Sequence, residues 1–312
     1  MANAIHDVTT PPKAVLCPID FSDPSRGALR YAVTVASQAG AALTVLTVND
    51  PLLAQASDMA RGTGSLDAEA RAETERFFTD TFSGRTQPAA PRFEVATGAP
   101  DAEILRVARE QSTDVIVMSS RGATGLRKLF LGSTTERVLR GTTARVLVTP
   151  PGDPGPATFD DIRKRVRRIL LPVDLSVAMD TQVRLCIRLT TLLSSPLLLA
   201  HVIEPTRTIV PGHTYAASVD RERRDRAERR LEEFVETLPP HTSAEALVAF
   251  GDPAEEIAKI ASDRHAGLIV MGLHASAAPG TRMGSVTYRV LSITHGLVLA
   301  VPPAESVDRS TC

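Results

Sequence analysis

The residue types best suited to chemistry lie in residues 119–135, which follow the apolar run 115–118. Glycine lets a backbone approach an anion closely, and Gly132, Ser133 and Thr134 stand where a helix is expected to begin. The free N–H groups and the dipole of a helix start favour phosphate. The segment therefore predicts an anion-binding loop.

The basic side chains of this segment support anion binding, whereas its glycines alone leave two interpretations open. Arg121, Arg127 and Lys128 would add positive charge near a phosphate. A pair of glycines, here Gly122 and Gly132, is by itself also typical of a flexible surface loop. The preceding strand, the hydroxyl groups at a helix start and the nearby cations together favour anion binding.

A carboxylate, Asp20, follows the expected strand at residues 14–18. In open parallel sheets ligands bind outside the carboxyl ends of the strands, so Asp20 can face a ligand hydroxyl or a metal bound to phosphates. Alternatively, Asp20 begins a turn, and the following helix is capped through Asp23 and Ser25. The same placement recurs at Asp174, which favours a function.

The sequence offers no convincing catalytic set. None of its seven histidines is paired at metal-ligand spacing, and His201, at the end of a strand, is expected to be packed or hydrogen-bonded. A Gly-x-Ser-x-Gly elbow and a P-loop are both missing, and Cys17 lies inside a strand as a small core residue. We expect no catalytic residue, no metal site and at most slow nucleotide hydrolysis.

An internal repeat decides the architecture. Three pairs of segments coincide at offsets that drift only from 154 to 152 residues: 13–22 with 167–176, 115–118 with 268–271, and 132–133 with 284–285. The chain is therefore predicted to contain two copies of one unit. We expect a first domain at residues 1–150, a Pro- and Gly-rich linker at 151–165 and a second domain at 166–312.

Short β-branched runs alternate with segments of helical period in each copy. In the first copy we expect strands at residues 14–18, 42–48, 92–96, 115–119 and 145–149, and helices at 24–39, 66–82, 100–111 and 134–141. This alternation is typical of a parallel sheet covered on both faces. The predicted fold is α/β, with two tandem doubly wound five-stranded parallel-sheet domains.

The second copy contains a longer and heavily charged helix at residues 221–238. Its expected apolar stripe consists of Leu231, Phe234, Val235 and Leu238. Its charges are most simply a solvated face, and a nucleic-acid patch is the alternative.

The composition excludes several classes of protein. The 312 residues carry 35 Lys and Arg against 36 Asp and Glu, a net charge of −1 that does not suit a nonspecific nucleic-acid binder. Hydrophobic residues make up 43 %, which excludes global disorder. The three cysteines fit neither a disulfide framework nor a zinc cluster, and no signal peptide or membrane span is expected. We therefore expect a cytoplasmic protein with no nucleic-acid or membrane partner.

These residues resemble the universal stress protein family in its tandem form, over nearly the whole chain. The ATP-binding pattern of the family is Gly, two residues, Gly, nine residues, Gly, then Ser or Thr. The first copy has Ser119, two residues, Gly122, nine residues, Gly132 and Ser133, so only the first glycine departs from the pattern.

The resemblance implies that the first copy binds ATP, with or without Mg²⁺. It places Gly122, Gly132, Ser133 and Thr134 at the phosphates, and the loop residues Ser119, Arg121 and Gly125 are expected to belong to the same nucleotide site. It places beside the adenine and ribose the strand-end residues Pro18, Ile19, Asp20, Val48 and Met118.

The second copy departs further from the family pattern. From Gly272, two residues lead to Ala275 and eight more to Gly284, so the second glycine is absent and the loop is one residue shorter. The positions that survive are Pro172, Val173, Asp174, Val202, Gly272, Gly284 and Ser285. We expect a degenerate copy that serves as a structural partner, and a second nucleotide site is the alternative.

The resemblance implies an ATP-binding module of the stress response whose shape or affinity for a regulatory protein changes with the nucleotide. A nucleotide-independent interaction scaffold and a weak ATPase are the alternatives. The loop in the first copy favours ATP binding over the scaffold, and the missing catalytic base disfavours the ATPase.

Each copy ends in a short apolar strand, at residues 145–149 and 297–301, and a proline follows each strand. An edge strand leaves backbone N–H and C=O groups unpaired. Single-domain members of the family dimerise through this strand, so the resemblance implies pairing of residues 146–148 with 298–300 inside one chain. The expected product is an intramolecular pseudo-dimer, and a further homodimer is an open alternative.

Overall fold

The computed structural model describes residues 10–61, 64–84, 91–122, 131–175, 180–205, 213–273 and 283–303. The first half of the chain contains β1 (Ala14–Ile19), α1 (Asp23–Ala39), β2 (Ala42–Asn49), α2 (Pro51–Arg61), α3 (Ser65–Thr81), β3 (Arg92–Thr97), α4 (Pro100–Glu110), β4 (Val115–Ser119), α5 (Ser133–Gly141) and β5 (Arg145–Thr149). The second half contains α6 (Phe159–Arg165), β6 (Ile169–Pro172), α7 (Asp180–Leu193), β7 (Leu197–Ile203), α8 (His213–Glu236), β8 (Ala244–Phe250), α9 (Pro253–Asp263), β9 (Leu268–Gly272), α10 (Ser285–Ile293) and β10 (Leu297–Val301).

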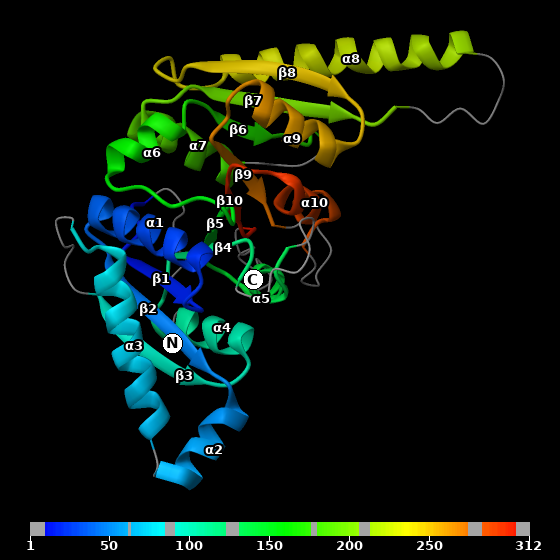
Figure 1. The fold of residues 1–312 in the computed structure, drawn as a ribbon. Helices are drawn as coiled ribbons and strands as arrows, with labels where there is room; N and C mark the ends of the chain where they lie inside the picture. The colour runs from blue at the N-terminus through cyan, green and yellow to red at the C-terminus, as the bar shows by residue number, and fades with distance from the viewer. Residues whose placement is uncertain are drawn as a thin grey trace, which may run out of the picture.

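Ten strands form one continuous sheet in the order β3-β2-β1-β4-β5-β10-β9-β6-β7-β8. The strands within each half are parallel to one another, and the two halves meet where β5 and β10 pair antiparallel (Figure 1). Each half therefore has the doubly wound order 3-2-1-4-5, as the alternating strands and helices predicted.

The junction between the halves confirms the predicted strand pairing. Val146 lies opposite Ala300, Leu147 opposite Leu299 and Val148 opposite Val298. All the residues of β5 and β10 are buried, so the two terminal strands become the centre of the sheet and their backbone groups are no longer at an edge.

Side chains of alternate strand residues divide the core into two layers. Cys17 belongs to the layer covered by α1, α3, α7 and α8, whereas its neighbour Leu16 belongs to the layer covered by α4, α5, α9 and α10. Cys17 is fully buried, which raises the pKa of its thiol far above the usual range, so the predicted core role is confirmed. None of the described helices combines the length and the apolar character that crossing a bilayer needs.

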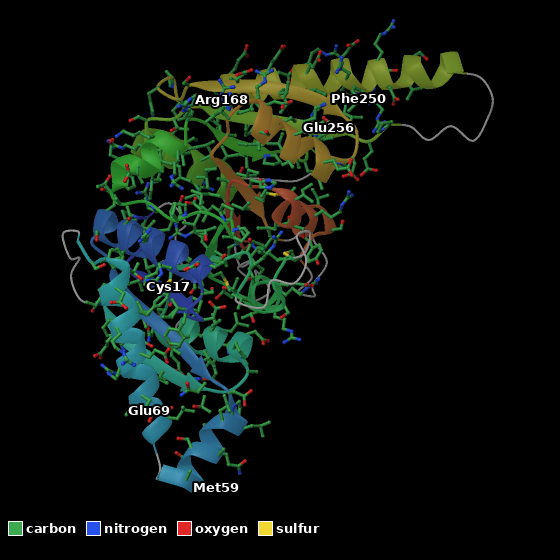
Figure 2. The ribbon with its side chains drawn as sticks, viewed as in Figure 1. Cys17, Met59, Glu69, Arg168, Phe250 and Glu256 are labelled. Carbon is green, nitrogen blue, oxygen red and sulfur yellow. The ribbon has the colours of Figure 1, made fainter. Side chains whose placement is uncertain are left out.

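Three helices differ from the sequence expectation. Helix α2 was not predicted, although Asp50 caps it by accepting a hydrogen bond from the Leu52 N–H at 2.7 Å. It protrudes from one end of the molecule, with the exposed Met59 near its tip (Figure 2). Helix α6 lies inside the segment expected to be a linker, and α8 begins at His213, earlier than expected. The predicted stripe of α8 is confirmed, because Leu231 is buried and Phe234 and neighbouring apolar residues pack on the same layer.

The segment between the halves is packed against α1. The buried Tyr31 hydroxyl donates a hydrogen bond to Asp153 Oδ2 at 2.7 Å, and Arg165 forms an ion pair with Asp153 and donates to the Tyr31 hydroxyl at 3.1 Å. Burial, reinforced by Asp153, raises the pKa of the Tyr31 phenol well above its usual range. Arg30 donates to the Pro154 carbonyl at 2.7 Å. These contacts fix the connection that the composition alone predicts to be an irregular linker.

We expect Tyr31→Phe to lower the free energy of unfolding by about 1–2 kcal/mol, because it leaves Asp153 and Arg165 without their shared buried hydroxyl. Chemical denaturation measures the change. Tyr288→Phe is the matched control, since its hydroxyl makes no hydrogen bond to any described residue. Equal losses in the two variants would contradict a role for the Tyr31 contact.

Candidate nucleotide site

The topology predicts a crevice between the carboxyl ends of β1 and β4. β1 pairs with β2 over six residues but with β4 over only two, Val15↔Val115 and Leu16↔Ile116. The chain runs from β1 to β2 on one side of this point and from β4 to β5 on the other. The strand order therefore reverses here, where open α/β sheets bind their ligands.

The turn after β1 is organised around Asp20 and Ser22. Ser22 is the N-cap of α1, and its hydroxyl accepts a hydrogen bond from the Ser25 N–H at 3.2 Å. Asp20 Oδ1 in turn accepts from the Ser22 N–H at 3.2 Å and from the Ser22 hydroxyl. Capping through Asp23 and Ser25 is therefore wrong: Asp23 is the first residue of the helix. Asp20 is exposed, and one of its oxygens holds the cap.

Gly122 lies directly against the other Asp20 oxygen. A Cβ atom at position 122 would lie 2.4 Å from Asp20 Oδ2, far inside van der Waals contact. The structure thus brings together two residues that are about 100 positions apart in the sequence and that the spacing assigned to one site. Only glycine leaves both the carboxylate and the loop backbone accessible at this point.

The start of α5 completes the described part of the site. Gly132 is the N-cap, and within the described residues no side chain caps the helix start, where Ser133 and Thr134 lie. The Gly132 N–H donates to the Ser120 carbonyl at 2.8 Å, and the buried Thr135 hydroxyl donates to the Ser119 carbonyl at 2.9 Å. These two bonds hold the helix start against the end of β4, with its first N–H groups at the crevice.

The remaining predicted residues lie around the same strand ends. Val48 packs on the α4–α5 layer of the sheet and Met118 is buried in it, and the alternation along β1 directs Pro18 to that face as well. Ile19 is buried on the opposite face beneath α1, so only its backbone is available to a ligand. Arg121 is half-buried directly after the β4 segment, whereas Gly125, Arg127 and Lys128 lie outside the described residues.

The second half repeats this backbone arrangement. The Gly284 N–H donates to the Leu273 carbonyl at 3.0 Å, and the Thr287 hydroxyl donates to the Gly272 carbonyl at 2.9 Å. Gly284 is the N-cap of α10 with nearly the dihedral angles of Gly132, and Ser285 follows it. The helix start is therefore preserved in the degenerate copy.

The side chains around this second helix start are less suited to a polar ligand. Leu273, which is fully buried, replaces Ser120 at the corresponding position. The His201 ring nitrogen Nδ1 lies 2.9 Å from the Val173 carbonyl, so the expected hydrogen-bonded histidine is confirmed and occupies an acceptor at the crevice. Pro172 and Val202 are half-buried and Asp174 is exposed at the strand ends, while Ala275 lies outside the described residues.

Sequence reasoning missed three residues that shape the site. Ser22 carries the cap, Thr135 anchors α5, and Ser120 provides the carbonyl that holds Gly132. The repeat contained a signal for Thr135, because Thr287 occupies the same place in the second copy and makes the same bond.

Both halves are doubly wound α/β units in which the strand order reverses beside a helix start that no described side chain caps. This arrangement defines the class of α/β fold in which such points suit anionic ligands. The model of the universal stress protein family matches residues 12–150 and again residues 165–302. The chain therefore belongs to the universal stress protein family, in a tandem form.

Known proteins support this membership. Universal stress protein YxiE of Bacillus subtilis is 31 % identical over 145 residues, which cover 43 % of this chain and 96 % of that protein. A 54-residue match to universal stress protein MJ0577 of Methanocaldococcus jannaschii is 39 % identical and spans 17 % of this chain but only 33 % of that protein. The crystal structure of a universal stress protein from Archaeoglobus fulgidus matches with a TM-score of 0.61 at 20 % identity, covers 95 % of this chain and 98 % of its own, and shows the same fold.

Proposed function

We propose that this chain is an ATP-binding protein of the stress response and that it holds nucleotide mainly in the first of two domains, residues 1–150 and 166–312, joined by residues 151–165. The observation that carries the proposal is the convergence of Asp20, Gly122 and the uncapped start of α5 on one crevice. ATP bound there would supply a nucleotide-dependent signal to a regulatory partner.

Each group of residues has a distinct part in this proposal. The N–H groups at Gly132, Ser133 and Thr134 would bind phosphate oxygens, and the backbone at Gly122 would let the phosphates approach. Asp20 Oδ2 would accept from a ribose hydroxyl or hold a phosphate-bound Mg²⁺. The assignment extends to the other predicted residues of the loop and strand ends: Pro18, Ile19, Val48, Met118, Ser119, Arg121 and Gly125.

Releasing nucleotide from freshly purified protein by heat, and identifying it by chromatography and mass spectrometry, tests the proposal. ATP or ADP in the supernatant supports it. Protein that releases no nucleotide and shows no heat of binding when ATP is added, with and without Mg²⁺, would favour the nucleotide-independent scaffold instead.

We expect saturation near one ATP per chain. An exposed Asp and a preserved helix start occur in both halves, but in the second half the buried Leu273 replaces Ser120, and His201 contacts the Val173 carbonyl. The second loop also lacks the second glycine of the family pattern, at Ala275, and is one residue shorter. Calorimetric titration measures the stoichiometry, and a value near two would contradict the asymmetry. A Gly122→Val variant that still binds one ATP would place the nucleotide in the second half.

A further inference from the structure

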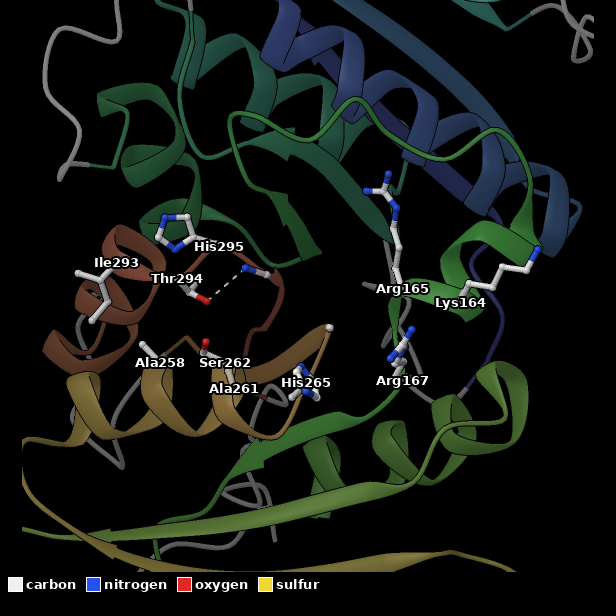
Figure 3. A pocket seen from close by; sticks show the side chains of 13 residues that line it. Lys164, Arg165, Arg167, Ala258, Ala261, Ser262, His265, Ile293, Thr294 and His295 are labelled. Carbon is white, nitrogen blue, oxygen red and sulfur yellow. Dashed lines mark hydrogen bonds between the residues drawn. The ribbon is translucent and has the colours of Figure 1, made fainter.

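A pocket of about 510 Å³ lies away from the candidate nucleotide site, at the amino ends of β9 and β10. Its walls come from the end of α6 and the residues after it, and from the ends of α9 and α10 (Figure 3). Ala258, Ala261 and Ile293 make part of its wall apolar. The volume is in the range of small-molecule sites.

Basic side chains dominate the polar part of this lining. The thirteen lining residues include Lys164, Arg165, Arg167, His265 and His295 and no acidic residue. Lys164 is paired with Asp160 at 2.8 Å, and Arg165 with Asp153.

Three of these basic side chains are not paired within the pocket. Arg167, His265 and His295 make no ion pair or hydrogen bond through their side chains to any described residue. Their hydrogen-bond donors are therefore available to a ligand in the pocket.

Two helix C-termini also reach the pocket. The ends of α9 and α10 each carry a partial negative charge of about half a unit, roughly one unit together. His265 and His295 lie two residues beyond these ends. Arg167 belongs to neither helix and brings a permanent positive charge to the pocket.

Comparison with the first half shows how the pocket arises. Leu105 stands at the position of Ala258, and its Cδ1 lies 2.7 Å from where a Cβ of Gly141 would be. The second half has Ala258 and Ile293 at these two positions, so there the bulky side chain comes from α10 and Ala258 leaves the α9 wall low. Asp114 stands at the position of Gly267 and accepts from the Lys13 N–H at 2.7 Å. A Cβ at Gly267 would lie 2.2 Å from the Arg165 carbonyl, so the connection between the halves excludes a carboxylate there.

We propose that this pocket binds the phosphate group of a small molecule, with Arg167 as the main anchor and His265 and His295 as further donors. The Arg167 guanidinium can donate two parallel hydrogen bonds to phosphate oxygens, and the ring N–H groups of His265 and His295 can donate to the others, so the pocket offers more donors than a single carboxylate would use. Because β5 and β10 are antiparallel, the amino ends of the second half lie on the same edge of the sheet as the Asp20–Gly122 crevice.

Titration of the ¹⁵N-labelled full chain with inorganic pyrophosphate, followed by NMR, tests this inference. We expect the amide resonances of Gly267 and Gly296 to shift with saturation, while those of Gly122 and Gly132 report separately on the candidate nucleotide site. Arg167→Gln should weaken the binding seen at Gly267 roughly tenfold, the loss expected for a charge-assisted contact.

Two further variants separate a built site from diffuse attraction. Ala258→Leu adds bulk to the wall of the pocket without a change of charge and should also weaken binding about tenfold. Lys13→Gln removes the corresponding charge at the amino edge of the first half and should leave the Gly267 titration unchanged. The inference is overturned if pyrophosphate leaves Gly267 and Gly296 unshifted, or if Arg167→Gln and Ala258→Leu titrate like the wild type. The same titration with inorganic phosphate and with a phosphate monoester shows whether the pocket binds the free ion or a phosphate group carried by a small molecule.

Discussion

Gly122→Val is expected to weaken ATP binding on the order of 100-fold, or about 2.7 kcal/mol. The new Cβ would lie 2.4 Å from Asp20 Oδ2, so the carboxylate must swing away from the crevice, and the branched side chain then fills the space that the phosphates require. The clash involves only the end of a mobile side chain, and Gly122 is exposed, so the fold should persist. Isothermal titration calorimetry measures the affinity.

Gly152→Val provides the matched control for this loss. A Cβ at Gly152 would meet nothing within 4 Å, and the residue is exposed. We expect wild-type ATP affinity in this control and thermal unfolding within a few degrees of wild type in both variants. Unchanged ATP affinity in Gly122→Val would refute the assignment of the phosphate site.

Leu147→Pro is expected to destabilise the whole chain by about 3 kcal/mol or more. Leu147 lies in the middle of β5, which pairs with β4 on one side and with β10 on the other. Because proline has no N–H, the variant loses a backbone hydrogen bond to one of these two strands. The proline ring also distorts the centre of the ten-stranded sheet. Chemical denaturation gives the loss in stability.

Leu147→Ala separates the backbone effect from the side-chain effect. It removes the buried side chain but keeps the N–H, so the difference between the two variants reports the ladder. Hydrogen exchange should show a larger loss of protection in β10 than in β2 and β3 for the proline variant. Full protection of β10 would mean that the β5–β10 pairing contributes little to the union of the halves.

The strands and most helices could be predicted from the spacing of apolar residues along the sequence. All five expected strands of the first half appear within a residue or two of their predicted ends, because buried parallel strands are continuous β-branched runs. Helix α2 was missed although Asp50 and Pro51 form a capped start, since its face exposes Leu52, Leu53 and Met59 and lacks a packed stripe. Helix α6 was hidden by the prolines before it, although Thr158 and Asp161 form a capping box.

The sequence predicted which residues lie at the candidate site, but not the hydrogen bonds that hold them in place. Loop spacing and the rule for strand ends brought Asp20 and Gly122 together. The choice of Ser22 as the cap depended on backbone angles that residue types leave open. The basic pocket could not be foreseen, because Arg167, His265 and His295 come from three separate segments that only the assembled sheet makes neighbours.

The central position of β5 has a consequence for synthesis on the ribosome. β5 is complete once residue 149 has been made, whereas its antiparallel partner β10, at residues 297–301, is the last strand to be synthesised. At about 5–20 residues per second, roughly 8–30 s separate the two events. During that interval the first half presents an apolar, unpaired strand of five residues to its surroundings. Nascent chains of this protein are therefore predicted to need either a chaperone at that strand or a rapid arrival of the second half, and crowded polysomes offer the same strand to a neighbouring chain as a site for exchange of halves.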